Sequence, residues 1–235
     1  MPDHAEIYRR QADQYEQLVS REDYQGHLLP ALQQIGAFAG LTVAELGAGT
    51  GRLTRLVAPI VKDVHAFDLS RPMLDLARVK LQEGRDTNWR IAVADHRQVP
   101  LGDGVADIVL SGWSVCYLVV ENDLSWEGEL SKALLEMRRI VRPGGALILI
   151  ETLGTGREEP EAPAGLAAYY AYLQAVGFEH LWVRTDYLFR DNAEADSLTR
   201  FFFGDDMVAK IRQNEHGVVL PECTGIWWVR RAPGS

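Results

Sequence analysis

A glycine-rich turn is the strongest chemical signal in the sequence. Gly47, Gly49 and Gly51 follow a predicted strand and open a predicted helix. Glycine is needed where a backbone turns tightly and where a ligand approaches main-chain atoms. Asp68 ends the next predicted strand, and a carboxylate there can accept both hydroxyls of a ribose. The two features together predict a nucleoside-binding site; the alternative is a tight turn followed by a capping aspartate.

The spacing of the turn argues against a dinucleotide. In the dinucleotide fingerprint G-x-G-x-x-G, the third glycine packs the helix on the strand and the helix N-terminus faces a pyrophosphate. Arg52 occupies the place of that third glycine, and Glu45 lies two residues before the turn. A carboxylate at that place would repel a pyrophosphate but could attract a cationic group. An NAD-dependent dehydrogenase therefore stays only as a remote alternative.

The elements around the turn alternate between strands and helices. Strands are predicted at 41–49, 63–70, 89–95, 106–114, 146–152, 180–189 and 225–231. Helices are predicted at 5–20, 26–39, 51–61, 71–82, 125–141, 166–178 and 196–213. Such alternation predicts an α/β fold: a doubly wound, mostly parallel seven-stranded sheet with helices on both faces.

The organisation along the chain predicts one domain over residues 1–235. Residues 1–40 form an N-terminal helical cap, and residues 41–152 form the cofactor-binding core. Residues 153–235 complete the sheet and carry a late helical insertion on the substrate side. A chain of 235 residues is long enough to bury a sizeable core.

The charge distribution bears on the partners. The chain has 33 acidic and 24 basic residues, a formal net charge of −9. This balance makes nucleic acid an unlikely partner, because phosphate backbones are normally met by a basic face. The core is nearly neutral, and the excess acid lies in the cap and the tail, which should close over the ligand. We therefore expect a small-molecule partner that is neutral or cationic; surface solubility is the alternative explanation of the charge.

The location also follows from composition. No run of 18 apolar residues occurs and the N-terminal segment is polar with acids, so we expect neither a membrane span nor a signal peptide. Cys116 and Cys223 make no disulfide framework and lack metal-ligand spacing. We expect a cytoplasmic protein without a metal ion, and a homodimer is a possible assembly.

Four segments in order resemble the class I S-adenosylmethionine-dependent methyltransferases. ELGAGTG (45–51) resembles the first motif of that family, and FDLS (67–70) resembles its second. VADHRQVPLGDGVADIVLS (93–111) and LLEMRRIVRPGGALIL (134–149) are similar to the blocks around its third to fifth strands. The resemblance is good over residues 41–152 and looser over the rest, and it implies S-adenosyl-L-methionine as the cofactor.

The resemblance implies contacts to the methionine end of that cofactor. The backbone of Gly47, Ala48 and Gly49 would line it. Glu45 would support the turn or the amino group, directly or through water. Ser111, after the fourth strand, would offer its carbonyl to the amino group.

It also implies contacts to the nucleoside end. Asp68 would accept from the ribose hydroxyls, and Leu69 and Met73 would pack on the adenine face. Asp95 would accept from the exocyclic amine, with His96 donating a backbone N–H. For His96 a solvated loop histidine is the alternative.

The remaining candidates are one tyrosine over the cofactor and four residues on the acceptor side. Tyr15 resembles a tyrosine that folds over the cofactor, or else it packs between helices. Trp113 and Tyr117, after the fourth strand, could line a substrate pocket or pack under the cap. His27 could act as a base or lie on the surface. Glu151, predicted to end the fifth strand, could face the cleft or only support it.

The implied reaction is the in-line transfer of a methyl group to a nucleophilic N, O or C atom. The cofactor carries the reactive group, so the protein chiefly binds, aligns and excludes water. A general base is optional, so no catalytic residue is predicted. A protein or RNA acceptor, or a cofactor-binding protein without catalysis, remain open alternatives.

Overall fold

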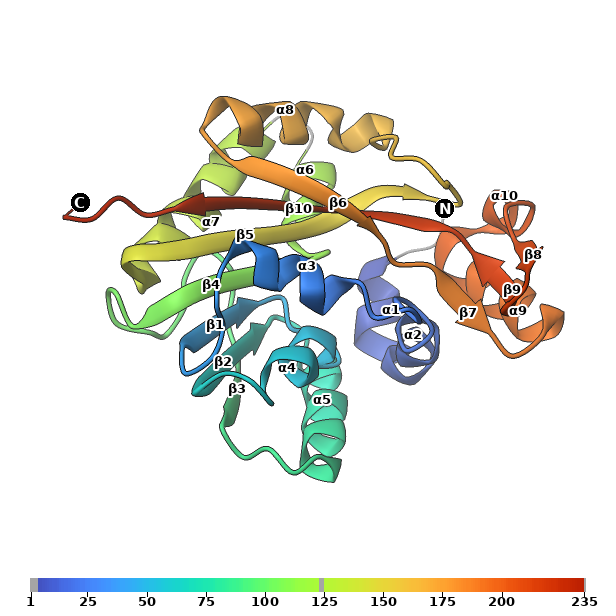
Figure 1. The fold of residues 1–235 in the computed structure, drawn as a ribbon, viewed down its shortest axis with the longest axis horizontal. Helices are drawn as coiled ribbons and strands as arrows, with labels where there is room; N and C mark the ends of the chain where they lie inside the picture. The colour runs from blue at the N-terminus through green and yellow to red at the C-terminus, as the bar shows by residue number, and fades with distance from the viewer. Residues whose placement is uncertain (1–3, 123–124, 235) are drawn as a thin grey trace.

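The centre of the computed structural model, which describes residues 4–122 and 125–234, is a seven-stranded sheet (Figure 1). Its strands are β1 (Thr42–Leu46), β2 (Asp63–Asp68), β3 (Trp89–Val93), β4 (Ala106–Gly112), β5 (Val141–Thr155), β6 (Glu179–Arg184) and β10 (Glu222–Arg230). They lie in the order β3-β2-β1-β4-β5-β10-β6. The first five pair in parallel, and β10 runs antiparallel to both β5 and β6. The predicted doubly wound, mostly parallel sheet is confirmed.

Helices cover both faces of the sheet because the central strand is apolar on both sides. Along β5, Leu147 and Leu149 belong to one core, whereas Ile148 and Ile150 belong to the other. The first core packs against α6 (Val115–Val120), α7 (Trp126–Ile140), the 3₁₀ turn η1 (Ala164–Leu166) and α8 (Ala167–Ala175). The second packs against α3 (Leu28–Ile35), α4 (Arg52–Val57) and α5 (Arg71–Glu83).

The N-terminal cap begins with two short helices, α1 (His4–Arg10) and α2 (Ala12–Val19). The single helix predicted at 5–20 is wrong at Gln11, whose backbone (φ −129°, ψ 32°) leaves the helical region. Figure 1 shows both helices between the core and the segment that follows β6. An ion pair between Lys80 and Glu16 ties α2 to α5.

An insertion between β6 and β10 forms a second small sheet. It consists of β7 (Tyr187–Phe189), α9 (Asn192–Phe203), α10 (Asp205–Val208), β8 (Arg212–Asn214) and β9 (Gly217–Leu220). The three strands pair antiparallel in the order β7-β9-β8. Leu18 of α2 is fully buried in the core of this insertion, so cap and insertion pack as neighbours.

Two predicted elements in this region are wrong. The strand predicted at 180–189 is divided, because the buried Asp186 carboxylate accepts hydrogen bonds from Arg184 Nε (2.8 Å) and from the Glu222 amide (2.9 Å). The chain then joins the small sheet. The helix predicted at 196–213 ends at Gly204, whose φ of +89° departs from helical geometry. Residues 212–214 are a strand.

The helices found in residues 4–122 and 125–234 are all too short or too polar to cross a bilayer.

Candidate functional site

The glycine turn lies where the strand order of the sheet reverses. Between β1 and β4 the connections run in opposite directions, so a crevice is expected at their carboxyl ends. Gly47, Gly49 and Gly51 all have left-handed backbones, with φ of +76°, +55° and +81°. A Cβ on Gly47 would lie 2.3 Å from the Cβ of Ser114, so only glycine lets the loops after β1 and β4 meet.

Asp68 joins the turn to the end of β2. One carboxylate oxygen accepts from the Gly49 amide (2.8 Å) and the other from the Ser70 amide (2.7 Å). Burial raises the pKa of this carboxyl, and the two amide hydrogen bonds oppose that rise. Ser70 also caps α5 and donates its hydroxyl to the carbonyl of Tyr8 in α1 (2.7 Å). The cap therefore rests directly beside the carboxylate.

Apolar side chains flank Asp68. Leu69 is 59% exposed. Val93, which pairs with Asp68 in the neighbouring strand β3, is 50% exposed. Met73 is buried, and its Cε lies 3.6 Å from the point where a Gly49 Cβ would be. An exposed apolar surface beside a carboxylate fits the adenosine half of a nucleoside cofactor.

Asp95 lies at the end of this nucleoside side. Its carboxylate is held by Arg97, whose Nε and Nη2 donate over 2.8 and 2.5 Å. That hydrogen-bonded cation lowers the pKa of Asp95, so the group stays ionised. The fixed carboxylate can accept from an adenine amine.

His96 is buried, unlike the solvated loop histidine that was the alternative to a backbone contact. Its Nε2 lies 2.9 Å from Ser114 Oγ and 3.1 Å from the point where a Gly47 Cβ would be. Burial lowers the pKa of the imidazole to about 4, so it is neutral at neutral pH. The ring supports the turn from below, a contact that sequence reasoning missed because nothing local predicts Ser114.

Glu45 and Ser111 are buried within the sheet. Glu45, in β1, accepts a hydrogen bond from Thr54 in α4. Burial raises the pKa of Glu45 to about 8. Ser111 lies inside β4 rather than after it, and its hydroxyl has no hydrogen-bond partner among residues 4–122 and 125–234. Both side chains stand under the turn.

Five aromatic rings from the four helices α1, α2, α6 and α9 gather near the turn. They are those of His4, Tyr8, Tyr15, Tyr117 and Phe202, with ring centres 4.5 to 5.8 Å apart in the closest pairs. Tyr8 and Tyr117 share a 2.6 Å hydrogen bond, and Tyr117 lies 3.3 Å from His4 Nδ1. His4 Nε2 donates to the Phe202 carbonyl (3.1 Å), since a carbonyl only accepts. We call this group the aromatic cluster.

The aromatic cluster brings together two of the predicted residues, Tyr15 and Tyr117, with three that sequence reasoning did not assign. Burial raises the pKa of Tyr15, which also senses the charges of Arg52 and Asp68. Tyr15 thus connects the cluster to the turn. Phe202 joins the cluster, and its neighbour Phe203 packs on Tyr187.

The Trp113 ring contacts Arg52, which occupies the place of the third glycine of the dinucleotide fingerprint. The Arg52 guanidinium lies 4.3 Å from the centre of the Trp113 ring, and its Nη1 donates to Glu22 at 2.5 Å. Trp113 has a left-handed backbone (φ +48°), held by a hydrogen bond from its amide to the Ile150 carbonyl. The signal for Arg52 was its place after the turn; nothing local pointed to Glu22.

His27 lies apart from the other candidates. It is exposed just before α3, where its Nδ1 donates to the Arg184 carbonyl (2.9 Å) and its amide donates to Asp23. Its hydrogen bonds serve the junction between cap and sheet, and it shares none with Trp113, Tyr117 or Glu151.

Glu151 is fully buried in the middle of β5, not at its end as predicted. Its Oε1 accepts from the Cys116 amide (3.1 Å) and the Tyr169 hydroxyl (3.2 Å). Among the described parts of the chain, Oε2 has no partner. Burial raises the pKa of this carboxyl from 4.5 to about 7. The group can hold or release a proton near neutral pH.

The raised pKa of Glu151 makes a prediction about stability. A carboxyl whose folded pKa is raised stabilises the fold below the unfolded pKa, and this contribution is lost as the pH rises through the folded pKa. Relative to Glu151→Gln, the wild type should lose about 2.5 kcal/mol of unfolding free energy between pH 5 and pH 8. Urea titrations at both pH values measure this, with the exposed Glu127→Gln as control. A pH-independent difference would contradict it.

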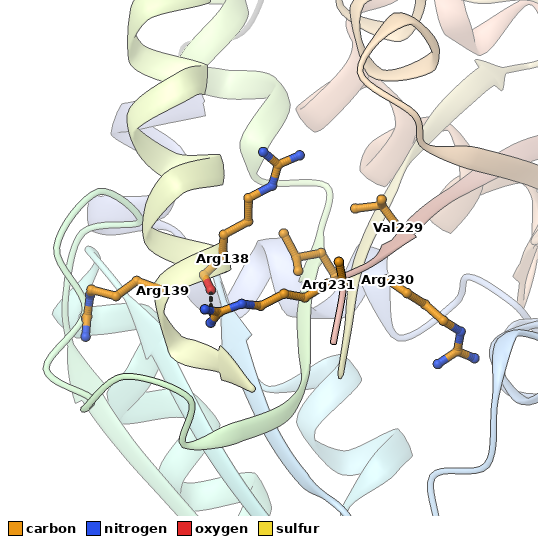
Figure 2. Close-up of a pocket in the computed structure, with 7 residues that line it drawn as sticks. Arg138, Arg139, Val229, Arg230 and Arg231 are labelled. Carbon is orange, nitrogen blue, oxygen red and sulfur yellow. Dashed lines mark hydrogen bonds between the residues drawn. The ribbon is translucent and has the colours of Figure 1, made fainter. Parts of the chain in front are cut away.

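A surface cavity of about 450 Å³ lies far from this crevice, at the amino ends of the parallel strands. Figure 2 shows that its arginines do not converge: Arg138, Arg139 and Arg230 point in different directions. Arg231 donates to the Arg138 carbonyl (2.9 Å). The cavity offers no focused charge and no candidate ligand contact.

Comparisons with known proteins agree on one domain type. A family model described as "Methyltransferase domain" matches residues 44–149. Malonyl-[acyl-carrier protein] O-methyltransferase of Salmonella typhimurium is 34% identical over 143 residues, 61% of this chain and 51% of the relative. Demethylmenaquinone methyltransferase of Tropheryma whipplei is 31% identical over 121 residues, 52% of this chain and 46% of the relative. The chain thus spans about half the length of these curated relatives.

Among solved structures, an Aquifex aeolicus SAM dependent methyltransferase shares the fold with a TM-score of 0.53 at 16% identity. The likeness covers 85% of this chain and 87% of the other.

Proposed function

We propose that this chain, whose residues 44–149 match a methyltransferase domain, acts as a class I S-adenosylmethionine-dependent methyltransferase on a nucleophilic N, O or C atom of a small molecule. One observation carries the proposal. The Gly49 amide and the Asp68 carboxylate meet at 2.8 Å, where the order of the strands reverses. This is the place at which open α/β sheets bind nucleosides.

The residues at the crevice fit S-adenosyl-L-methionine, the cofactor of the family. Asp68 would hold the ribose, with Leu69 and Met73 beside the adenine and Asp95 at its amine. A glycine turn into which a Cβ cannot be built supports close approach of the methionine end. When bound, the cofactor supplies an electrophilic methyl group on a sulfonium.

The backbone of Gly47 and Ala48 would line the methionine end of the cofactor. Three further residues would support the turn or contact this end: Glu45, His96 and Ser111. The side chains of Ala48, Glu45, His96 and Ser111 are buried, and the imidazole of His96 is neutral at neutral pH. Buried residues of this kind can align the reacting groups and exclude water, and this can supply much of the rate enhancement. We propose that Tyr15 closes the site from above.

We propose that the acceptor lies among the aromatic cluster and Trp113, and that it is neutral or cationic. Aromatic rings suit flat or cationic groups. We place the buried carboxyls of Glu22, Glu151 and Glu222 on this side, where Glu22 is paired with Arg52. As to location, we propose a reducing, cytoplasmic compartment, which the two free thiols of Cys116 and Cys223 support.

A transfer assay tests the proposal. Purified chain and tritiated S-adenosyl-L-methionine are incubated with pools of small metabolites, with tRNA and with protein extract. We expect label in the metabolite pools. Label in tRNA or protein instead would show that the methyl acceptor is a macromolecule and not a small molecule. Binding of the cofactor without transfer to any pool would favour a cofactor-binding protein without catalysis.

A further inference from the structure

The Arg52 side chain connects three parts of the molecule. It begins directly after the glycine turn and pairs with Glu22, in the turn that follows α2. Its guanidinium covers the Trp113 ring, which follows β4. Tyr15 and Tyr187 are also within range of its charge. Turn, cap, insertion and acceptor side therefore meet at this one group.

The charge of Arg52 is already balanced. Glu22 accepts from Arg52 Nη1 through one carboxylate oxygen, and from the Thr185 hydroxyl (3.1 Å) through the other. Thr185 in turn lies 2.6 Å from the Thr224 hydroxyl in β10. Both oxygens of Glu22 are occupied, so the ion pair is fixed and formally neutral.

The second amino group of Arg52 has no such partner. Nη2 is buried and has no hydrogen-bond partner within residues 4–122 and 125–234. A guanidinium nitrogen carries two N–H donors, and buried donors are nearly always satisfied. An unsatisfied donor beside Trp113 and Tyr15 is what a ligand oxygen would complete.

We propose that Arg52 Nη2 donates a hydrogen bond to an uncharged oxygen, such as a carbonyl, of the methyl acceptor; this inference rests on the proposed function. A carboxylate fits less well, because Glu22 has neutralised the guanidinium and the buried Glu222 senses Glu22 as a like charge. The same balance makes Arg52 a poor anchor for the carboxylate of the cofactor.

Three matched probes test the inference on protein loaded with S-adenosylhomocysteine. 1-Tetralone carries a ring and a carbonyl, tetralin lacks the oxygen, and 1-naphthoate carries a carboxylate. Ligand-observed NMR titrations give the affinities. We expect 1-tetralone to bind about tenfold more tightly than either other probe, since a site with an unpaired donor discriminates against ligands that leave it unpaired.

The variants separate this role from a structural one. Arg52→Lys keeps a cation for Glu22 and Arg52→Gln keeps an amide, and the exposed Arg55→Lys on the same helix is the control. We expect the preference for 1-tetralone to shrink to about twofold or less in both Arg52 variants, with the affinity for S-adenosylhomocysteine unchanged. The Arg55 variant should behave as the wild type.

Four results would overturn the inference. Equal affinity of wild type for 1-tetralone and tetralin, or a preference kept in Arg52→Lys, would show that Nη2 binds no acceptor oxygen. Tightest binding of 1-naphthoate would assign it to an anion. A tenfold loss of S-adenosylhomocysteine affinity in Arg52→Lys would assign it to the cofactor. Failure of the wild type to bind S-adenosylhomocysteine would instead contradict the proposed function.

Discussion

Replacing Gly47 by alanine should abolish cofactor binding and destabilise the fold. The added Cβ would lie 2.0 Å from Ser114 Oγ and 2.3 Å from Ser114 Cβ, so a backbone must move. The left-handed backbone at this position adds conformational strain. We expect a loss of about 2–4 kcal/mol of unfolding free energy and at least about a 100-fold loss of affinity for S-adenosylhomocysteine.

Gly40→Ala is the matched control for this experiment. Gly40 has nearly the same φ, +74°, but a Cβ there would meet nothing within 4 Å. Its cost should be limited to about 1 kcal/mol of conformational strain, with cofactor binding intact. Urea unfolding and calorimetric titration measure both quantities. Full affinity in Gly47→Ala would mean that the cofactor does not lie against this turn.

Replacing Asp68 by alanine should weaken cofactor binding at least about tenfold, because the ribose hydroxyls lose a charged acceptor. The Gly49 and Ser70 amides lose their partner as well. Asp68→Asn keeps one acceptor oxygen, so its affinity for the cofactor should lie between those of the wild type and Asp68→Ala.

The exposed Asp75 on α5, paired with Arg71, provides the control for Asp68. Asp75→Ala should leave the affinity for S-adenosylhomocysteine unchanged. If Asp68→Ala also binds with wild-type affinity while its melting temperature falls, the carboxylate serves only to hold the turn.

Local chemistry explains what the sequence could predict. The turn and the carboxylate of Asp68 depend on residues close in the chain, so pattern reasoning located them. The strand predicted at 146–152 likewise lies within β5. The order of the motifs then predicted the sheet.

Long-range pairing explains what was missed. The break at Asp186 depends on the Glu222 amide, 36 residues away in the sequence. The strands of the small sheet have three or four residues, too few for a periodic signal. The pairing of Arg52 with Glu22 joins segments 30 residues apart, and neither residue type predicts its partner.

The acidic surplus of the cap and the tail is partly internal. Glu22 of the cap and Glu222 of the tail are buried rather than on the surface, as is Glu151 in β5 of the core. Burial raises the pKa of Glu151 to about 7 and that of Glu222 to about 8. Because these pKa values lie at or above neutral pH, part of the formal acidic surplus consists of buried, protonated carboxyls and not of surface charge.

Calorimetric titration of the purified chain with S-adenosyl-L-methionine, S-adenosylhomocysteine and NAD tests the central claim most directly. The turn with Arg52 in place of the third glycine, and with Glu45 and Asp68 around it, predicts binding of both sulfur nucleosides and no binding of NAD. Binding of NAD without binding of either sulfur nucleoside would contradict the account.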